Sequence, residues 1–345
     1  MVGVLVKEFA NGVMLPAVSL GCWQLYGDAP STPVAVEAAL KGGYYALDDA
    51  QCYNNEHVTG PIVAKFGKEE MKKASKFDPS AEGTPFKVVS EAEYFGSFEK
   101  PHGKPTDDRA VFVTTKIWCS NFDPAGIRKQ VEQHLKDFQR SSIDLLLLHW
   151  PGNHVAWCQD ESMMKDPKNA ETRLTCWKTF EELYAEGKVR AIGLSNYMVQ
   201  HLLPLVEDIK KRKDAGCPKA RMPFVNQIEI SAFCQVPEAL EKLCKEYDIT
   251  FTSYSSLGSA KAVQENISDK AIQTIADKHK VSPANVLIRW CMQKGYTVLP
   301  RSKHPERVQA NYGPTLTFAL DQDDMNAINK MNLDRRTGSN PHDIA

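Results

Sequence analysis

The sequence predicts a parallel barrel of eight strand-helix units, the (β/α)8 or TIM barrel of the α/β class. Three observations lead to this prediction. Short apolar or β-rich runs alternate along the chain with longer stretches of helical periodicity. Several of those stretches end at a glycine, as helix C-termini commonly do. A chain of 345 residues with 42% hydrophobic content can also bury one large core, and regular strand-helix alternation builds a parallel sheet.

The elements follow one another in a regular order. A hairpin comes first, because two apolar runs at 5–9 and 13–18 flank Asn11-Gly12, a strong turn signal. The barrel strands are runs rich in aliphatic, aromatic and β-branched residues. We predict strands at 17–23, 44–49, 111–118, 143–150, 190–195, 224–230, 250–256 and 296–302, and helices that include 32–43, 124–138, 175–188, 237–247 and 281–295.

We expect one domain over residues 1–345, with two unusual segments. Residues 68–109 are polar and rich in Gly and Pro, and they precede the third strand, so they should leave from the N-terminal face of the barrel. Their simplest interpretation is a tolerated surface elaboration. The loop from Gly152 to about Thr175 follows the fourth strand and should overhang the opposite face. Its larger side chains, which could reach a substrate, are Val155, Trp157, Met163 and Met164.

Composition excludes several classes of function. The formal net charge is −1 and the pI is about 6.8, which gives no bulk electrostatic case for nucleic acid or an anionic membrane. The chain shows neither a secretory signal nor a long apolar run, so we expect a cytoplasmic protein, and a monomer. Nine cysteines without a CxxC pair, and histidines without HExxH spacing, indicate reduced thiols and no metal site.

Four polar residues at the ends of successive segments can take part in proton transfer: Asp48, Tyr53, Lys116 and His149. A lysine in a run as apolar as 111–118 should be buried, and Asp48 is its obvious partner. The ammonium should stabilise the phenolate of Tyr53 and lower its pKa from ~10 toward neutral pH, which makes the phenol a usable general acid. His149 could donate a hydrogen bond to a carbonyl oxygen.

Each of these four residues also has an ordinary structural interpretation. A tyrosine in a loop usually packs, and a histidine after an apolar strand is more often a hydrogen-bonded core residue. A buried ion-pair network without catalysis is the best form of this alternative. However, the C-terminal ends of parallel strands meet at one mouth of a barrel, and all four groups fall there in order. We therefore favour an active site.

The sequence resembles the aldo-keto reductase family over nearly its whole length. The matching pieces stand in family order: SLGCW, GYYALDDAQCYNNE, TTKIW, SSIDLLLLHWP, GKVRAIGLSN, VNQIEI, TSYSSLGS and VLPRSKHPERVQAN. The resemblance implies an NADPH-dependent oxidoreductase that reduces aldehydes and ketones, with the four residues above as its catalytic set and Tyr53 as the proton donor. It further implies that the hairpin covers the bottom of the barrel and that residues 68–109 are an insertion.

The cofactor must bind without a GxGxxG or GxxxxGK[ST] motif, because neither occurs. Arg301, Ser302 and Arg307 place two guanidiniums and a hydroxyl within seven residues, and Asn311 follows. Guanidinium geometry matches phosphate, so this cluster favours the 2′-phosphate of NADPH over NADH, although a solvated basic loop is the alternative. The resemblance supports the phosphate role.

The resemblance also supplies the rest of the cofactor site, for which exposed polar residues at strand ends are the ordinary alternative. It implies Ser195, Asn196 and Gln227 at the nicotinamide carboxamide, Tyr254 stacked on the nicotinamide ring, and Ser255, Leu257 and Ser259 along the pyrophosphate.

The substrate pocket is less defined by the sequence. Trp23, Trp118 and Trp150 end three of the strands and could supply an apolar wall beside His149, although a tryptophan taken alone is more often a core residue. The stretch after Arg336 is short compared with relatives whose tails close over the pocket, which predicts an open site and broad specificity. Aldoses, methylglyoxal, aromatic aldehydes, quinones and lipid-derived ketones all stay open as substrates. A regulatory cofactor-binding subunit and a lens-type structural protein are the alternative functions.

Overall fold

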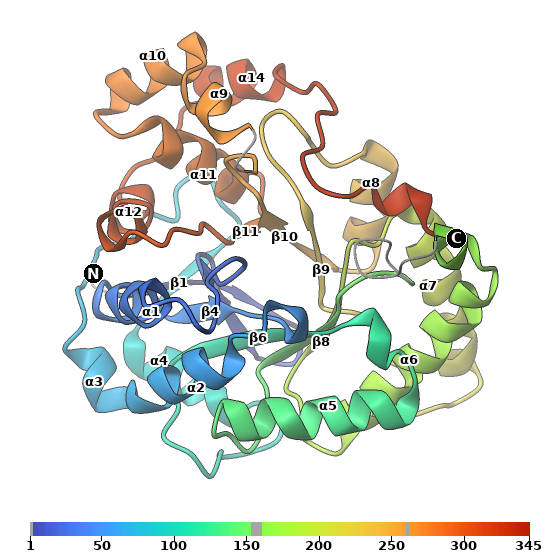
Figure 1. Ribbon diagram of the computed structural model, residues 1–345. Coiled ribbons are helices and arrows are strands. Elements are labelled where there is room, and N and C mark those ends of the chain that lie inside the picture. Colours follow the sequence, from blue (N-terminus) through green and yellow to red (C-terminus); the bar gives the residue numbers. More distant parts are fainter. Residues whose placement is uncertain (1–2, 153–160, 260–261) are drawn as a thin grey trace.

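The structure is a computed structural model that describes residues 3–152, 161–259 and 262–345, and its centre is a parallel barrel ringed by helices (Figure 1). The strands pair in the order β11-β10-β9-β8-β7-β6-β4-β3, and a bridge between Val18 and Val298 joins the two ends. The predicted fold class is confirmed. The barrel strands are β3 (Leu20–Gly21), β4 (Ala46–Asp48), β6 (Phe112–Ile117), β7 (Leu145–Leu148), β8 (Ile192–Ser195), β9 (Val225–Glu229), β10 (Thr250–Tyr254) and β11 (Thr297–Val298).

Helices surround the barrel because their apolar faces pack on strands that are buried on both sides. None of the helices in the described ranges is long and apolar enough to cross a membrane. The α-helices are α1 (Ser31–Lys41), α2 (Glu56–Lys65), α3 (Lys68–Lys72), α4 (Glu91–Gly96), α5 (Pro124–Asp137), α6 (Lys168–Ala185), α7 (Val199–Asp214), α8 (Glu238–Glu246), α9 (Val263–Ile267), α10 (Lys270–His279), α11 (Pro283–Gln293), α12 (Pro305–Ala310), α13 (Gly313–Leu316) and α14 (Gln322–Asn329). Short 3-10 turns are η1 (Gln51–Tyr53), η2 (Ser97–Glu99), η3 (Cys119–Asn121), η4 (Glu161–Lys165) and η5 (Pro341–Asp343).

The N-terminal hairpin, β1 (Val4–Glu8) and β2 (Met14–Pro16), covers the bottom of the barrel as expected. The Phe9 ring stacks on Phe224, with centroids 5.2 Å apart, and Asn11 Nδ2 donates to the main-chain oxygen of Arg190 at 3.0 Å. Phe224 and Arg190 precede β9 and β8, so the hairpin lies at the N-terminal ends of the strands.

The segment at residues 68–109 builds part of the same lid. Its strand β5 (Lys87–Val89) pairs antiparallel with β1, and Phe86, Tyr94 and Phe98 are buried in the main core. The interpretation as a tolerated surface elaboration is therefore wrong, because large aromatic side chains of this segment pack inward. The segment does lie at the N-terminal face, as expected. Its status as an insertion within a single domain stays a prediction.

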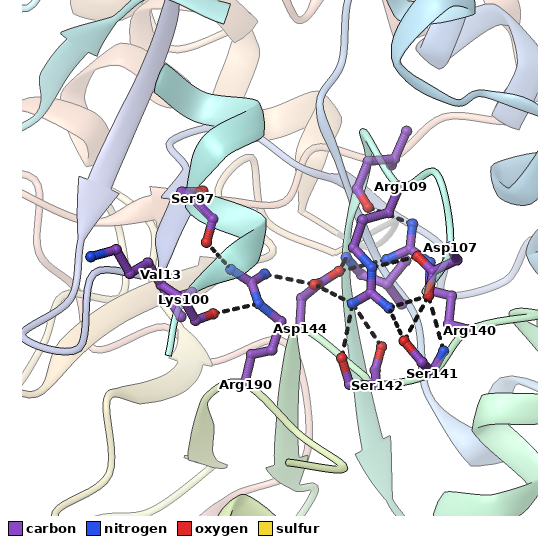
Figure 2. A network of polar contacts seen from close by, with 12 residues as sticks. Val13, Ser97, Lys100, Asp107, Arg109, Arg140, Ser141, Ser142, Asp144 and Arg190 are labelled. Atoms are coloured by element: carbon purple, nitrogen blue, oxygen red, sulfur yellow. Dashed lines mark hydrogen bonds and ion pairs between the residues drawn. The ribbon is translucent and has the colours of Figure 1, made fainter. Parts of the chain in front are cut away.

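A buried carboxylate fastens this segment to the barrel (Figure 2). Asp144, just before β7, contacts Arg140, Arg190 and Arg109 at 2.6, 2.7 and 3.3 Å. Arg190 also donates to the main-chain oxygen of Ser97 in η2. Burial would raise the pKa of Asp144, but the three guanidiniums hold it below its ordinary value. The network therefore keeps its charges and ties the lid to the strand starts.

One predicted loop is shorter than expected. Helix α6 begins at Lys168, so the loop that should have reached about Thr175 ends earlier. The first turns of α6 bury polar side chains: Asn169 donates to the main-chain oxygens of Met163 and Met164. A helix whose buried face begins with polar residues lacks the apolar periodicity from which helices are predicted.

Candidate active site

The four residues at the barrel mouth lie close together around Lys116. Its Nζ atom is 2.5 Å from Asp48 Oδ1, 3.2 Å from the hydroxyl oxygen of Tyr53 and 2.7 Å from the main-chain oxygen of Asp49. The Lys116 side chain is fully buried, and the ammonium sits 4.9 Å from the centre of the Tyr53 ring. The predicted pairing of Lys116 with Asp48 is present, and the ammonium contacts the carboxylate and the phenol simultaneously.

Local structure explains this convergence. β4 and β6 are adjacent parallel strands, and Asp48 and Lys116 lie at their C-terminal ends. Tyr53 closes the 3-10 turn η1 that follows β4. Gln51 in the same turn fixes its position, because its Oε1 atom accepts from the main-chain N–H of Trp118 at 2.8 Å. Sequence reasoning missed Gln51, since a polar residue in a short turn has no periodic signal.

The pKa of Tyr53 differs from the sequence-based expectation. Burial, followed by the charge of Asp48, raises the pKa of the phenol well above its ordinary value. The expected lowering of this pKa by Lys116 is wrong for this arrangement, because burial of the phenol and the neighbouring charge of Asp48 together raise it. Tyr53 thus holds its proton at neutral pH, the state required of a proton donor.

His149 follows β7 and faces the phenol across the mouth. Its ring meets Tyr53 and Trp118 edge to face, with centroids 5.8 and 5.1 Å away. Its Nδ1 atom lies 3.6 Å from Cys52 Sγ, and its main-chain oxygen accepts from Asn196 Nδ2 at 3.0 Å. The imidazole is thereby oriented from several sides.

The residues expected at the nicotinamide carboxamide form one hydrogen-bonded group. Gln227 Nε2 donates to Asp48 Oδ2 at 2.7 Å, and the Gln227 main-chain oxygen accepts from Ser195 Oγ at 2.8 Å. The Tyr254 hydroxyl donates to Asn196 Oδ1 at 2.6 Å. Gln227 therefore links this group directly to the Asp48–Lys116 ion pair.

The other expected cofactor residues lie on two further segments. After β10, Ser255 has a left-handed backbone (φ 53°), Leu257 is partly buried, and Ser259 N donates to Thr337 Oγ1 at 3.1 Å. After β11, Arg301 donates to Gln24 Oε1, Ser302 Oγ accepts from His304 N at 3.1 Å, and α12 carries Arg307 with Asn311 at its C-terminus.

The expected pocket tryptophans fall into two places. Trp23 is 45% exposed and its ring lies 5.0 Å from that of Tyr53. Trp118 and Trp150 are buried and form a cluster with Cys119 and Ile344. Met163 is half exposed and Met164 packs against the cluster, whereas Val155 and Trp157 lie outside the described residues.

The short C-terminal segment packs against the tryptophan cluster, and the open site with broad specificity stays a prediction. Ile344 is completely buried against the tryptophan cluster, and its main-chain oxygen is 2.9 Å from His201 Nε2. Arg173 Nη1 contacts the Ala345 oxygen at 2.5 Å. The short segment still reaches the mouth, because polar groups of α6 and α7 hold its backbone there. Sequence reasoning missed Ile344, since its anchors are far away in the chain.

A cavity of about 290 Å³ adjoins the phenol of Tyr53, away from the tryptophan cluster. It is lined by Tyr26, Gly27, Asp28, Tyr53, Asn54 and His57. Tyr53 therefore borders an accessible space, while the tryptophan cluster adjoins the neighbouring His149. Among the described residues no group of three His, Cys, Asp or Glu side chains could hold a metal ion.

Known proteins resemble this chain over nearly its whole length. The model of the Aldo/keto reductase family matches residues 17–333. The chain belongs to this family. It is 31% identical to the 9,11-endoperoxide prostaglandin H2 reductase of Trypanosoma cruzi, covering 96% of this chain and 93% of that protein. It is also 29% identical to the glyoxal reductase of Bacillus subtilis, with 97% and 95% covered.

A solved structure resembles this aldo-keto reductase over nearly its whole chain. The crystal structure of a Gox0644 mutant in complex with NADPH superposes with a TM-score of 0.71 at 28% identity and covers 98% of each chain. The predicted family and enzyme class, an NADPH-dependent oxidoreductase, are thereby confirmed. The relatives named here are enzymes, which gives no support to the regulatory-subunit alternative.

Proposed function

We propose that this aldo-keto reductase reduces an aldehyde or ketone to the alcohol, with Tyr53 giving its phenolic proton to the carbonyl oxygen. The observation that supports this most directly is the contact of a buried ammonium, Lys116, with both Tyr53 and Asp48. As the phenol loses its proton, negative charge develops on its oxygen, and the ammonium 3.2 Å away stabilises that charge. Asp48 pairs with this ammonium at 2.5 Å, and both side chains are buried.

His149 orients the carbonyl in this proposal. An imidazole N–H donated to the carbonyl oxygen would hold that oxygen toward the Tyr53 hydroxyl, and the two edge-to-face contacts fix the ring plane. Trp118 and Trp150 then give an apolar surface to the rest of the substrate. This division of roles places proton donor and hydrogen-bond donor on the same oxygen.

The residues beside Asp48 fit a nicotinamide cofactor. Ser195, Asn196 and Gln227 offer a hydroxyl and two amides in one connected group, the donors and acceptors that a carboxamide needs. Arg301 and Arg307 would hold the 2′-phosphate of NADPH through guanidinium hydrogen bonds. When bound there, NADPH supplies the hydride for the carbonyl carbon.

Replacement of Tyr53 by Phe tests the proposal. Turnover of a carbonyl panel, followed by NADPH absorbance, should fall at least about 100-fold, because general acid catalysis contributes that much or more. NADPH binding, measured by fluorescence titration, should stay within about twofold, since the phenol contacts the carbonyl and not the phosphates. Tyr247→Phe removes an exposed hydroxyl far from the mouth and serves as the control. A Tyr53→Phe enzyme that keeps a tenth of wild-type kcat would refute the assignment.

We also propose a monomer in the cytoplasm that acts on small carbonyl compounds and has no nucleic-acid or membrane partner. The near-zero net charge supports the absence of such partners. Light scattering after size exclusion, and fractionation of cells that express the protein, would test these expectations.

A further inference from the structure

Cys52, the residue before the proposed proton donor, lies against the imidazole that orients the carbonyl. Its Sγ atom is 3.6 Å from Nδ1 of His149, within hydrogen-bond range for sulfur. Cys52 is partly buried and also packs on the cluster of Trp118 and Trp150. Because Cys52 belongs to η1 and His149 follows β7, this contact joins two separate elements of the mouth.

The chemistry of the contact depends on where two protons reside. A neutral imidazole has one N–H, and the hydrogen bond made by one ring nitrogen sets the protonation of the other. Burial raises the pKa of Cys52 to about 12, although the charge of Lys116 acts in the opposite direction. The thiol therefore keeps its proton at neutral pH and has an S–H to donate to Nδ1.

We propose that Cys52 is a positioning residue: its S–H bond to Nδ1 holds the ring proton of His149 on Nε2, the nitrogen that donates to the carbonyl. This inference rests on the proposed function, since it concerns the proton that His149 offers to substrate. The plane of the ring is fixed separately by Tyr53 and Trp118. Loss of the thiol should thus shift the ring proton of His149 from Nε2 toward Nδ1, while the ring keeps its position.

Two substitutions separate this role from simple packing. Cys52→Val keeps a similar side-chain volume and removes the donor, whereas Cys52→Ser keeps a donor on a shorter bond. We expect kcat to fall about fivefold in the valine variant, which is the effect of losing one ordinary hydrogen bond. The kcat of the serine variant should lie between those of wild type and the valine variant. NADPH affinity should stay within about twofold. Cys217→Val, the same exchange at a partly buried site between α7 and β9, is the matched control.

Nitrogen NMR of histidine-labelled protein supplies a readout that packing alone would not move. The His149 signals are assigned by their loss in a His149→Asn chain, and in wild type they should show the Nε2–H tautomer. Cys52→Val should increase the Nδ1–H share. The proposal would be overturned if Cys52→Val kept wild-type kcat. It would also be overturned if kcat fell while the His149 tautomer stayed unchanged, because Cys52 would then only pack in the pocket wall.

The NMR result also separates this inference from the proposed function. The tautomer of His149 is measured without turnover, so it reports on the thiol contact whatever the reaction is. If Tyr53→Phe stays active, the proposed function fails. If Tyr53→Phe is inactive and the His149 tautomer is the same in Cys52→Val as in wild type, only the positioning role of Cys52 fails.

Discussion

Asp48 and Asp49 are neighbouring buried carboxyl groups whose bonding partners differ. Asp48 is paired with Lys116 and receives the Gln227 amide. Asp49 accepts from the Ala50 N–H at 3.0 Å and from Thr59 Oγ1 at 2.7 Å, and no described lysine or arginine side chain is within ion-pair distance. Burial, followed by the nearby carboxylate of Glu56, raises the pKa of Asp49 to about 8. The raised pKa favours the protonated form of Asp49 near neutral pH.

This pKa predicts a pH dependence of stability. In the unfolded chain Asp49 titrates near ~3.9, so between about pH 4 and 8 the folded protein retains a proton that the unfolded chain has lost. The free energy of unfolding should therefore decrease as pH rises through this window, by at most about 1.4 kcal/mol per pH unit from this group. Asp49→Asn resembles the protonated acid and should remove that contribution.

Urea unfolding at pH 6 and pH 8 measures the effect of Asp49→Asn. Wild type should lose more stability than the variant over this interval, while the exposed control Asp277→Asn should follow wild type. Parallel pH profiles for wild type and Asp49→Asn would show that Asp49 is already ionised at pH 6.

Individual residues differ in how far sequence determines their environment. Burial of Lys116 and its pairing with Asp48 were predictable, because an ammonium inside an apolar strand requires a carboxylate nearby. The raised pKa of Tyr53 was not, because it depends on how completely the folded chain buries the phenol and on the nearby charge of Asp48. Asp49 was missed for a similar reason: only the packing of α2 shows that its second contact is Thr59 and not a cation.

At the scale of elements, the C-terminal segment predicts a change in specificity. Ile344→Ala should leave a space beside Trp118 and Trp150, so bulky aromatic aldehydes should gain relative to small dicarbonyls. Apolar pocket changes of this size are worth about 1–3 kcal/mol, so the ratio of kcat/KM values should rise about tenfold. His342→Ala, in the exposed part of η5, is the control. An unchanged ratio would place the substrate on the other side of the mouth, toward Tyr26 and His57.

The segment from β11 into α12 predicts cofactor selectivity. Arg301→Ala and Arg307→Ala together should weaken NADPH by about 2–4 kcal/mol, because charge-assisted hydrogen bonds contribute roughly 1.5–3 each and do not add fully. NADH lacks the 2′-phosphate and should change little. Lys303→Ala removes a neighbouring exposed cation and is the matched control for general charge. Equal losses for both cofactors in a fluorescence titration would contradict the 2′-phosphate role.

Elements were predictable to the extent that their apolar pattern is local. The eight barrel strands lie within their predicted ranges, since each falls in a short run rich in aliphatic, aromatic and β-branched residues. The start of α6 was missed because Asn169 and Arg173 point inward to main-chain oxygens. The docking of Ile344 also depends on contacts with distant residues, here His201 and Arg173, that leave no periodic trace.

At the scale of the whole molecule, the two ends of the barrel have different roles. The ion pair of Asp48 and Lys116 lies at the C-terminal ends of the strands. The lid formed by β1, β2 and residues 68–109 lies at the N-terminal ends, anchored by Asp144 (Figure 2). In barrels of this type the first face serves chemistry and the second serves stability. Changes within the lid should therefore affect unfolding without affecting turnover.

Phe98→Ala tests this separation of the two ends. Phe98 is buried, its ring lies 5.3 Å from Tyr94, and the Arg190 guanidinium sits 5.0 Å from its centre. Removal of such a side chain leaves a cavity and should cost about 3–5 kcal/mol in the free energy of unfolding. The exposed neighbour Glu99→Ala should stay within about 0.5 kcal/mol of wild type. At a temperature where both variants are folded, kcat and KM should match wild type within about twofold. A Phe98→Ala enzyme with wild-type stability but altered kcat would mean that the lid communicates with the mouth, contrary to the division of the barrel into two faces.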